Sequence, residues 1–300
     1  MGKIKRLFVG GMLFLGGLGI FFYPNFQIWK IEEEVNQIEE QIETHHLESE
    51  KSKIILQKDK KVKDDMLYWE MKEYNQLLVS DGQELVDVWS YEEIPVELKY
   101  FKDVNQCIGY IEIPDMKVKL PLLIGASEEN LAKGAGILSE TSMPVGGKDT
   151  NCVIAAHRGW KGSPYFQYIE NMDYGSIVYI HTLWETRVYQ VVEFKIVDSY
   201  DLDSILIQKG KDMVTLMSCH PYGAPGGKLR YLVYCEYVEQ QDRQETKIDK
   251  NQEVNFISEQ KEKAEEKRKS KERILWEDIS RFILPGIIGI YFLFRIRKRK

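Results

Sequence analysis

Three residues in the C-terminal half of the chain have side chains suited to catalysis. The strand-like segment 213–219 ends on Cys219, and the uncharged segment 151–157 ends on His157. Arg230 stands near the start of the strand-like segment that follows Cys219. A thiolate is a strong nucleophile for acyl transfer, an imidazolium can protonate a departing amine, and a guanidinium can stabilise an oxyanion. Together the three predict a cysteine-dependent acyl transfer.

Two other kinds of function use the same residues differently. An exported cysteine hydrolase would need the same thiol but would take water as the acceptor. A membrane-held scaffold would bind a partner without any reaction, and a cysteine at a strand end would then serve only packing. The scaffold leaves the three strand-end residues unexplained, so we favour an enzyme.

A series of short strands must position these residues. From about residue 106 the hydrophobic pattern changes from helical to strand-like, with turn signals between the segments. Eight such segments in about 130 residues predict a mainly β fold, either a small closed barrel or a sandwich. Segments 127–134 and 163–172 interrupt the strands as expected short helices. The candidate strands are 107–113, 117–125, 135–140, 151–157, 176–182, 187–200, 213–219 and 229–238.

The N-terminal segment has the composition of a membrane anchor. Residues 7–23 carry no charge and follow Lys3, Lys5 and Arg6. About 17 apolar residues is the lower limit for a membrane-spanning helix. No small-residue cleavage site follows, which favours a retained anchor over a cleaved signal peptide.

The C-terminal segment mirrors the first. Residues 282–294 are apolar, the basic tail 295–300 closes the chain, and residues 274–279 would complete the span. Because basic flanks stay on the cytoplasmic side, both termini are expected in the cytoplasm and residues from about 25 to 275 outside it.

Charge and cysteine usage exclude several classes. The net charge is -6 and no basic face is evident, so a nucleic-acid partner is not expected. Cys152 and Cys235 lie within apolar strand-like segments and are predicted to be buried thiols. There is no Cys-x-x-Cys pair, and the proposed chemistry requires no metal or organic cofactor.

The residues around the thiol and the imidazole resemble those of the sortase family. Residues 214–219, VTLMSC, followed by an arginine, resemble the sortase pattern Thr-Leu-x-Thr-Cys and then Arg. Residues 141–159, TSMPVGGKDTNCVIAAHRG, resemble the segment that leads to the sortase histidine. The His-Arg-Gly sequence, the Pro-Tyr-Gly after the cysteine and the two expected anchors resemble class C sortases, which polymerise pilins. The resemblance covers about residues 85–240.

This resemblance implies a fold, a site and a reaction. The fold would be the closed eight-stranded sortase β-barrel, with Cys219, His157 and Arg230 as catalytic residues. The enzyme would cleave a Leu-Pro-x-Thr-Gly-like sorting signal through a thioester and join it to a lysine amine of another pilin subunit. It would act at the cell membrane of a Gram-positive-type bacterium. The alternative within the family is a sortase that anchors surface proteins to cell-wall peptide.

The chain departs from the family pattern at three places. Ser218 replaces the usual threonine and keeps its hydroxyl. Arg230 comes eleven residues after the cysteine, slightly more than is usual, which makes Lys228 a minor rival for the cationic role. The lid motif Asp-Pro-aromatic is matched only by Asp87 and Trp89, without the proline. In a lid, Trp89 would pack over the cysteine and Asp87 would pair with the arginine; otherwise Trp89 only anchors a loop.

The predicted domain organisation follows from these segments. An amphipathic helical pattern continues out of the first anchor, and a charged linker follows the last strand. The predicted parts are 1–25 as N-terminal anchor, 26–84 as helical region, 85–105 as lid-like segment, 106–240 as catalytic barrel, 241–273 as linker and 274–300 as C-terminal anchor with its basic tail.

Overall fold

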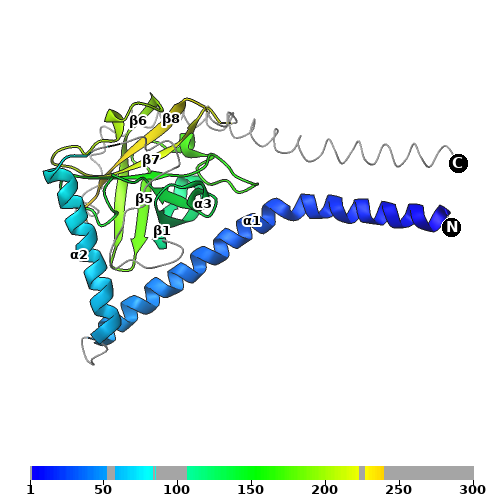
Figure 1. Cartoon of the computed structure of the whole chain (residues 1–300), viewed down its shortest axis with the longest axis horizontal. Helices are drawn as coiled ribbons and strands as arrows, with labels where there is room; N and C mark the ends of the chain where they lie inside the picture. Colours follow the sequence, from blue (N-terminus) through cyan, green and yellow to red (C-terminus); the bar gives the residue numbers. More distant parts are fainter. Residues whose placement is uncertain (1, 53–57, 84, 86–106, 223–226, 240–300) are drawn as a thin grey trace, which may run out of the picture. The chain divides into compact units, whose positions relative to one another are not determined.

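Eight strands close into one barrel (Figure 1), which is one of the two folds that the strand pattern allows and the one that the sortase resemblance implies. In the computed structural model, the described residues are 2–52, 58–83, 85, 107–222 and 227–239. The mainly β class and the closed barrel are therefore confirmed. The strands are β1 (Cys107–Ile113), β2 (Val118–Ile124), β3 (Ala135–Ile137), β4 (Thr150–Ala155), β5 (Ile177–Thr182), β6 (Thr186–Asp198), β7 (Asp212–His220) and β8 (Leu229–Tyr237).

The strand order brings distant segments together. Around the barrel the order is β1-β2-β3-β4-β7-β8-β6-β5. Strands β4 and β7 pair in parallel, although β5 and β6 separate them in the chain. Strand β8 pairs with β7 antiparallel. The C-terminal ends of β4 and β7 and the start of β8 consequently lie at one end of the barrel.

Two hydrophobic cores lie on the two faces of these strands. The larger core contains residues from all eight strands, among them Ile154, Leu216 and Val233, and fills the barrel interior. The smaller core contains the alternate positions of β4, β7 and β8, among them Met217 and Leu232, together with residues from the connecting segments. Because side chains alternate along a strand, β7 is buried on both faces. Burial on both faces explains why the sequence of β7 is almost continuously apolar.

The described residues also form three helices. Helix α1 spans Gly2–Ser52, α2 spans Lys58–Ser80, and α3 is a single turn, Glu128–Leu131, whose N-cap Ser127 accepts a hydrogen bond from the Asn130 amide. Three short 3-10 turns are also present, η1 (Pro114–Met116), η2 (Ile169–Asn171) and η3 (Asp203–Ile205).

The helix predicted over residues 163–172 is wrong in extent. Only η2, at its end, is helical. Tyr165 adopts a positive φ angle of 43°, which no α-helix can include. The segment is therefore a series of turns closed by η2.

Helix α1 packs against the barrel along one stripe. Val35 and Ile42 are buried and form a small cluster with Tyr110 of β1. Lys119 Nζ of β2 lies 2.5 Å from Glu39 Oε1. Val35 and Ile42 belong to the amphipathic helical pattern that follows the first anchor, and the helical region packs on the domain.

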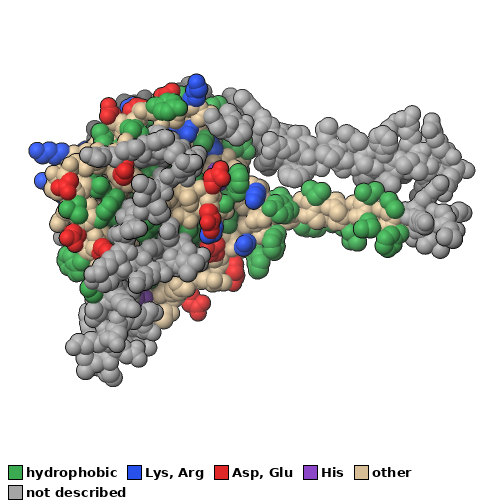
Figure 2. Space-filling view, viewed as in Figure 1, with side chains coloured by type: hydrophobic (Ala, Val, Ile, Leu, Met, Phe, Trp, Pro, Cys, Tyr) green, Lys and Arg blue, Asp and Glu red, His purple; other side chains and the backbone are tan. Residues whose placement is uncertain are grey.

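One helix among the described residues, α1, is long and apolar enough to cross a membrane. Figure 2 shows its hydrophobic side chains along the part that precedes the barrel contacts. The predicted lid-like segment lies outside the described residues except for Leu85, and the linker and the C-terminal anchor lie wholly outside them. The division into domains stays a prediction.

Candidate active site

The predicted residues come together at the ends of β4, β7 and β8. Ala155 pairs with Met217 across the parallel strands, so His157, two residues on, leaves β4 beside Cys219. Cys219 in turn pairs directly with Arg230 of β8. The thiol, the imidazole and the guanidinium all line one pocket.

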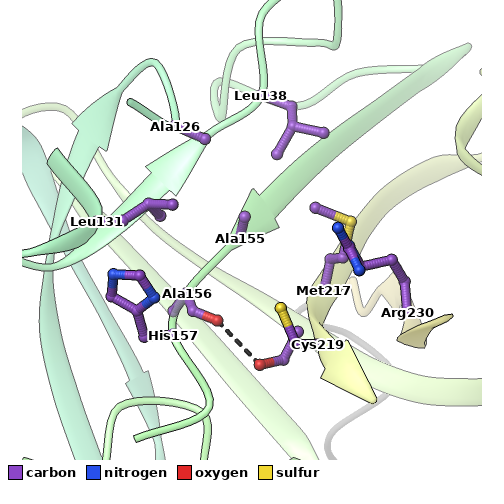
Figure 3. Close-up of a pocket in the computed structure, with 10 residues that line it drawn as sticks. Ala126, Leu131, Leu138, Ala155, Ala156, His157, Met217, Cys219 and Arg230 are labelled. Atoms are coloured by element: carbon purple, nitrogen blue, oxygen red, sulfur yellow. Dashed lines mark hydrogen bonds between the residues drawn. The ribbon is translucent and has the colours of Figure 1, made fainter. Parts of the chain in front are cut away.

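This pocket lies on the outer face of the strands and not in the barrel interior. Cys219 and Arg230 share the strand face of Met217 and Leu232, which belong to the smaller core. In Figure 3 the Cys219 sulfur lies between the His157 ring on one side and the Arg230 guanidinium on the other. The remaining lining is mostly apolar, from Ala126, Leu131, Leu138, Ala155, Ala156 and Met217. The site therefore lies at the ends of these strands, on their outer face.

Stacking holds the ring of His157 in place, and burial affects its protonation state. Its ring stacks on Trp160, with centroids 4.4 Å apart and an interplanar angle of 14°, and meets Tyr165 edge-on at 6.1 Å. Burial lowers the pKa of His157 below its usual 6.5, and the nearby carboxylate of Glu128 partly offsets this effect. The neutral imidazole is consequently favoured over the imidazolium at neutral pH.

Arg230 is held by backbone carbonyls. Its Nη1 donates to the carbonyl of Gly227 at 2.6 Å and to its neighbour Leu229 at 3.0 Å. The residue is 8% exposed and lines the pocket, whereas the rival Lys228 is exposed and is not among the lining residues. The longer separation from Cys219 therefore does not displace the arginine from the thiol.

The serine that replaces threonine keeps a structural contact. Ser218 Oγ donates to the Ala156 carbonyl at 2.9 Å (Figure 3), and the Ala156 amide donates to the Met217 carbonyl at 3.2 Å. These two bonds fasten the end of β4 to β7 immediately before His157 and Cys219. The hydroxyl thus helps to fix the spacing of the two reactive side chains.

Sequence reasoning missed a polar cluster behind the thiol. Arg158 Nη1 donates to the Cys219 carbonyl at 3.1 Å, and its Nη2 lies 2.6 Å from Glu170 Oε1. His220 Nδ1 lies 3.0 Å from the same Glu170 oxygen and 3.2 Å from Arg158 Nη1. Arg158 was read only as part of the His-Arg-Gly pattern, and nothing in the sequence pairs it with Glu170. The cluster joins the residue after His157 to the backbone of Cys219.

Removing this guanidinium should destabilise the protein. Hydrogen bonds to charged groups contribute about 1.5–3 kcal/mol each, so Arg158→Met should lower the free energy of unfolding by at least about 2 kcal/mol. Lys211→Met is the matched control, because Lys211 forms a 3.5 Å surface ion pair with Glu236 and should cost less than about 1 kcal/mol. Urea denaturation measures both; equal losses would contradict a structural role for the cluster.

Two further expectations have different outcomes. Cys152 and Cys235 are buried and unbridged, as predicted, and burial raises the pKa of both thiols. The lid residues Asp87 and Trp89 lie outside the described residues. Their roles stay predictions.

A thiol, an imidazole and a guanidinium meet in one pocket on the outside of a closed barrel. This arrangement is typical of a cysteine-dependent enzyme. Among known families, the model of the sortase domain matches residues 111–238. Sortase A of Staphylococcus aureus (strain NCTC 8325 / PS 47) is 34% identical over 130 residues, which cover 42% of this chain and 61% of that protein. Sortase D of Bacillus subtilis (strain 168) is 26% identical over 137 residues, covering 45% and 66%. The matched region thus spans at most about two thirds of these curated relatives.

Solved structures narrow the comparison. A sortase C of Streptococcus pneumoniae, whose description mentions pilin substrate specificity, is 31% identical, with a TM-score of 0.57 over 69% of this chain and 97% of that chain. Sortase C2 of Group B Streptococcus Pilus Island 1 is 32% identical, with a TM-score of 0.53 over 61% and 100%. Sortase C of Clostridium perfringens SM101 is 29% identical, with a TM-score of 0.51 over 69% and 99%. The chain belongs to the sortase family, and these structural neighbours are of class C.

Proposed function

We propose that this sortase is a membrane-anchored cysteine transpeptidase that links pilin subunits. The observation that carries the proposal is the meeting of Cys219, His157 and Arg230 in one external groove. The pocket lies on the outer face of the strands, where a protein substrate can reach the thiol. The apolar lining suits a Leu-Pro-containing sorting signal.

The acylation step would use all three side chains. The Cys219 thiolate attacks the carbonyl carbon of the threonine of the signal, and Arg230 stabilises the oxyanion that forms. The C–N bond then breaks, the imidazolium of His157 gives its proton to the departing glycine nitrogen, and a thioester remains on the sulfur.

The second step would transfer the acyl group to an amine. A lysine amine of another pilin subunit attacks the thioester carbonyl, and the neutral imidazole of His157 accepts the proton that this amine loses. The C–S bond breaks, an isopeptide bond forms, and the thiolate is regenerated. The reaction needs no metal or organic cofactor.

The likeness to class C structures favours pilin polymerisation over attachment to cell-wall peptide. Both alternatives use the same thioester and differ only in the acceptor amine. The apolar part of α1 supports an anchor that holds the enzyme where exported substrates emerge. Two-dimensional confinement raises the effective concentration of such substrates. We retain the expectation of an extracytoplasmic barrel.

The choice of acceptor separates a transpeptidase from a hydrolase. With a sorting-signal peptide and a pilin carrying the acceptor lysine, we expect the linked product to exceed the hydrolysed peptide. Supplying a cell-wall peptide amine in place of the pilin should give less linked product. Mass analysis of the products measures the ratio; hydrolysis unaffected by either amine would support the hydrolase instead.

A further inference from the structure

The end of the apolar part of α1 touches the turn that follows His157. A Cβ built on Gly162 would come within 2.5 Å of the Pro24 Cβ, so the two backbones are in close contact. Gly162 has a φ of 91°, and only glycine adopts this angle without strain and leaves this space. We call residues 159–163 the Trp160 turn. Trp160 and Ser163 close it through two backbone hydrogen bonds of 2.9 Å each.

Further contacts fix α1 in this position. Ile31 packs against the larger core, and the carboxylate of Glu34 lies close enough to Tyr165 to help raise its pKa. Farther along the helix, His46 Nε2 is hydrogen-bonded to the Leu183 carbonyl at 3.0 Å. Together with the Pro24–Gly162 contact and the Glu39–Lys119 ion pair, these contacts extend over more than twenty residues of helix, from Pro24 to His46. The height of the Trp160 turn along α1 is therefore set by the fold.

That height coincides with the end of the apolar run. Residues 7–23 form a helix about 26 Å long at 1.5 Å per residue, close to the hydrocarbon thickness of a bilayer, about 30 Å. Pro24 is the next residue, and it is the one that touches Gly162. If the run spans the membrane, the Trp160 turn lies at the level of the lipid headgroups.

The exposed side chains at this level are those found at membrane interfaces. Tyr23, Phe26 and Trp29 of α1 are 44%, 55% and 55% exposed. Trp160 is 39% exposed, and Lys161 Nζ lies 5.4 Å from the centre of its ring. Tryptophan and tyrosine are enriched at both membrane–water interfaces, and lysine places its charge among anionic headgroups.

We propose that the Trp160 turn rests on the bilayer surface and holds the groove of Cys219 beside it. This inference depends on the membrane anchoring proposed above. Because Trp160 also stacks on His157, the residue that would contact the membrane touches the catalytic imidazole directly. The groove would then receive a sorting signal near the membrane, where that signal emerges.

Lipid quenching of tryptophan fluorescence tests the proposal. The full chain is placed in bilayers of phosphatidylcholine and phosphatidylglycerol, with or without bromine on the acyl chains near the headgroups. Subtracting the spectrum of Trp160→Phe from that of the wild type isolates the emission of Trp160. Trp69→Phe is the matched control, because Trp69 on α2 is 67% exposed and far along the chain from the apolar run.

We expect bromine to weaken the emission of Trp160 and to leave that of Trp69 unchanged. Emission from Trp160 that bromine does not weaken would overturn the inference; a red-shifted spectrum would then place the ring in water, and a blue-shifted one against protein. Unchanged near-ultraviolet circular dichroism outside the tryptophan bands verifies that Trp160→Phe is folded. The readout needs no turnover, so an enzyme that transfers peptide without quenching would refute this inference alone. Quenching without peptide transfer would refute the proposed function alone.

Discussion

Replacing Cys219 with alanine should abolish peptide transfer, with a loss of at least about 10⁴-fold in the rate of acylation. Loss of a catalytic nucleophile has effects of this size, because no other group can form the covalent intermediate. The change removes only the thiol group of a partly exposed side chain near the end of β7, so the folded state should persist. The measurement is the rate of cleavage of a sorting-signal peptide, followed by chromatography.

Cys107→Ala is the control for this change. Cys107 is also partly exposed, but it lies at the start of β1 and does not line the groove. Its replacement should leave the cleavage rate within about twofold of the wild type, as for surface changes far from a site. If Cys219→Ala retained substantial cleavage, or if Cys107→Ala lost it, the thiol assignment would be wrong.

Replacing His157 with glutamine should slow acylation by an amide substrate about 10²- to 10⁴-fold, the usual contribution of general acid catalysis. A peptide thioester with the same sequence should lose less than about tenfold, because a thiolate leaves without being protonated. Stopped-time assays with the two substrates measure the difference. Equal losses with both would instead assign His157 a role in ionising the thiol or in folding.

The pH dependence of acylation tests the general-acid role of His157 independently. Since burial holds the pKa of His157 below 6.5, the imidazolium is lost as the pH rises through that lower value. The ratio of amide to thioester acylation should therefore fall about tenfold for each pH unit above it. Removing the charge of Glu128, which raises this pKa, should move the bend to lower pH. The neighbouring Glu129→Gln should not move it, because that carboxylate pairs with Lys133 on the surface.

Much of the fold could be predicted because each strand is short, apolar and bounded by turn residues. The apolar, turn-bounded sequence of β7 and its neighbours identifies them as strands but does not say which of two buried faces points into the barrel. For this reason the sequence located Cys219 and Arg230 at strand ends but did not indicate that they lie on the outer face of the barrel. Only the register between strands distinguishes these arrangements.

The polar cluster illustrates a contact that one sequence cannot reveal. Arg158 and Glu170 are separated by a series of turns with four residues at positive φ, so no helical or strand period relates them. The predicted helix over 163–172 failed for the same reason. When an irregular backbone brings two side chains together, no repeating pattern in the sequence predicts their contact.

Helix α1 shows the opposite case. Its apolar run and its later stripe of isoleucines and valines were both visible, and the stripe does pack on the barrel. The pattern could not show where along α1 the barrel makes its first contact, because Pro24 meets Gly162 only in the folded chain. Without the position of this contact along α1, the Trp160 turn cannot be placed relative to a membrane.

The most direct test of the account is the intact mass of the full-length enzyme shortly after mixing with a sorting-signal peptide and no amine. We predict a gain equal to the part of the peptide that ends at its threonine, held as a thioester on Cys219 and released when an amine is added. An unchanged mass during active cleavage, or an adduct on another residue, would contradict the account.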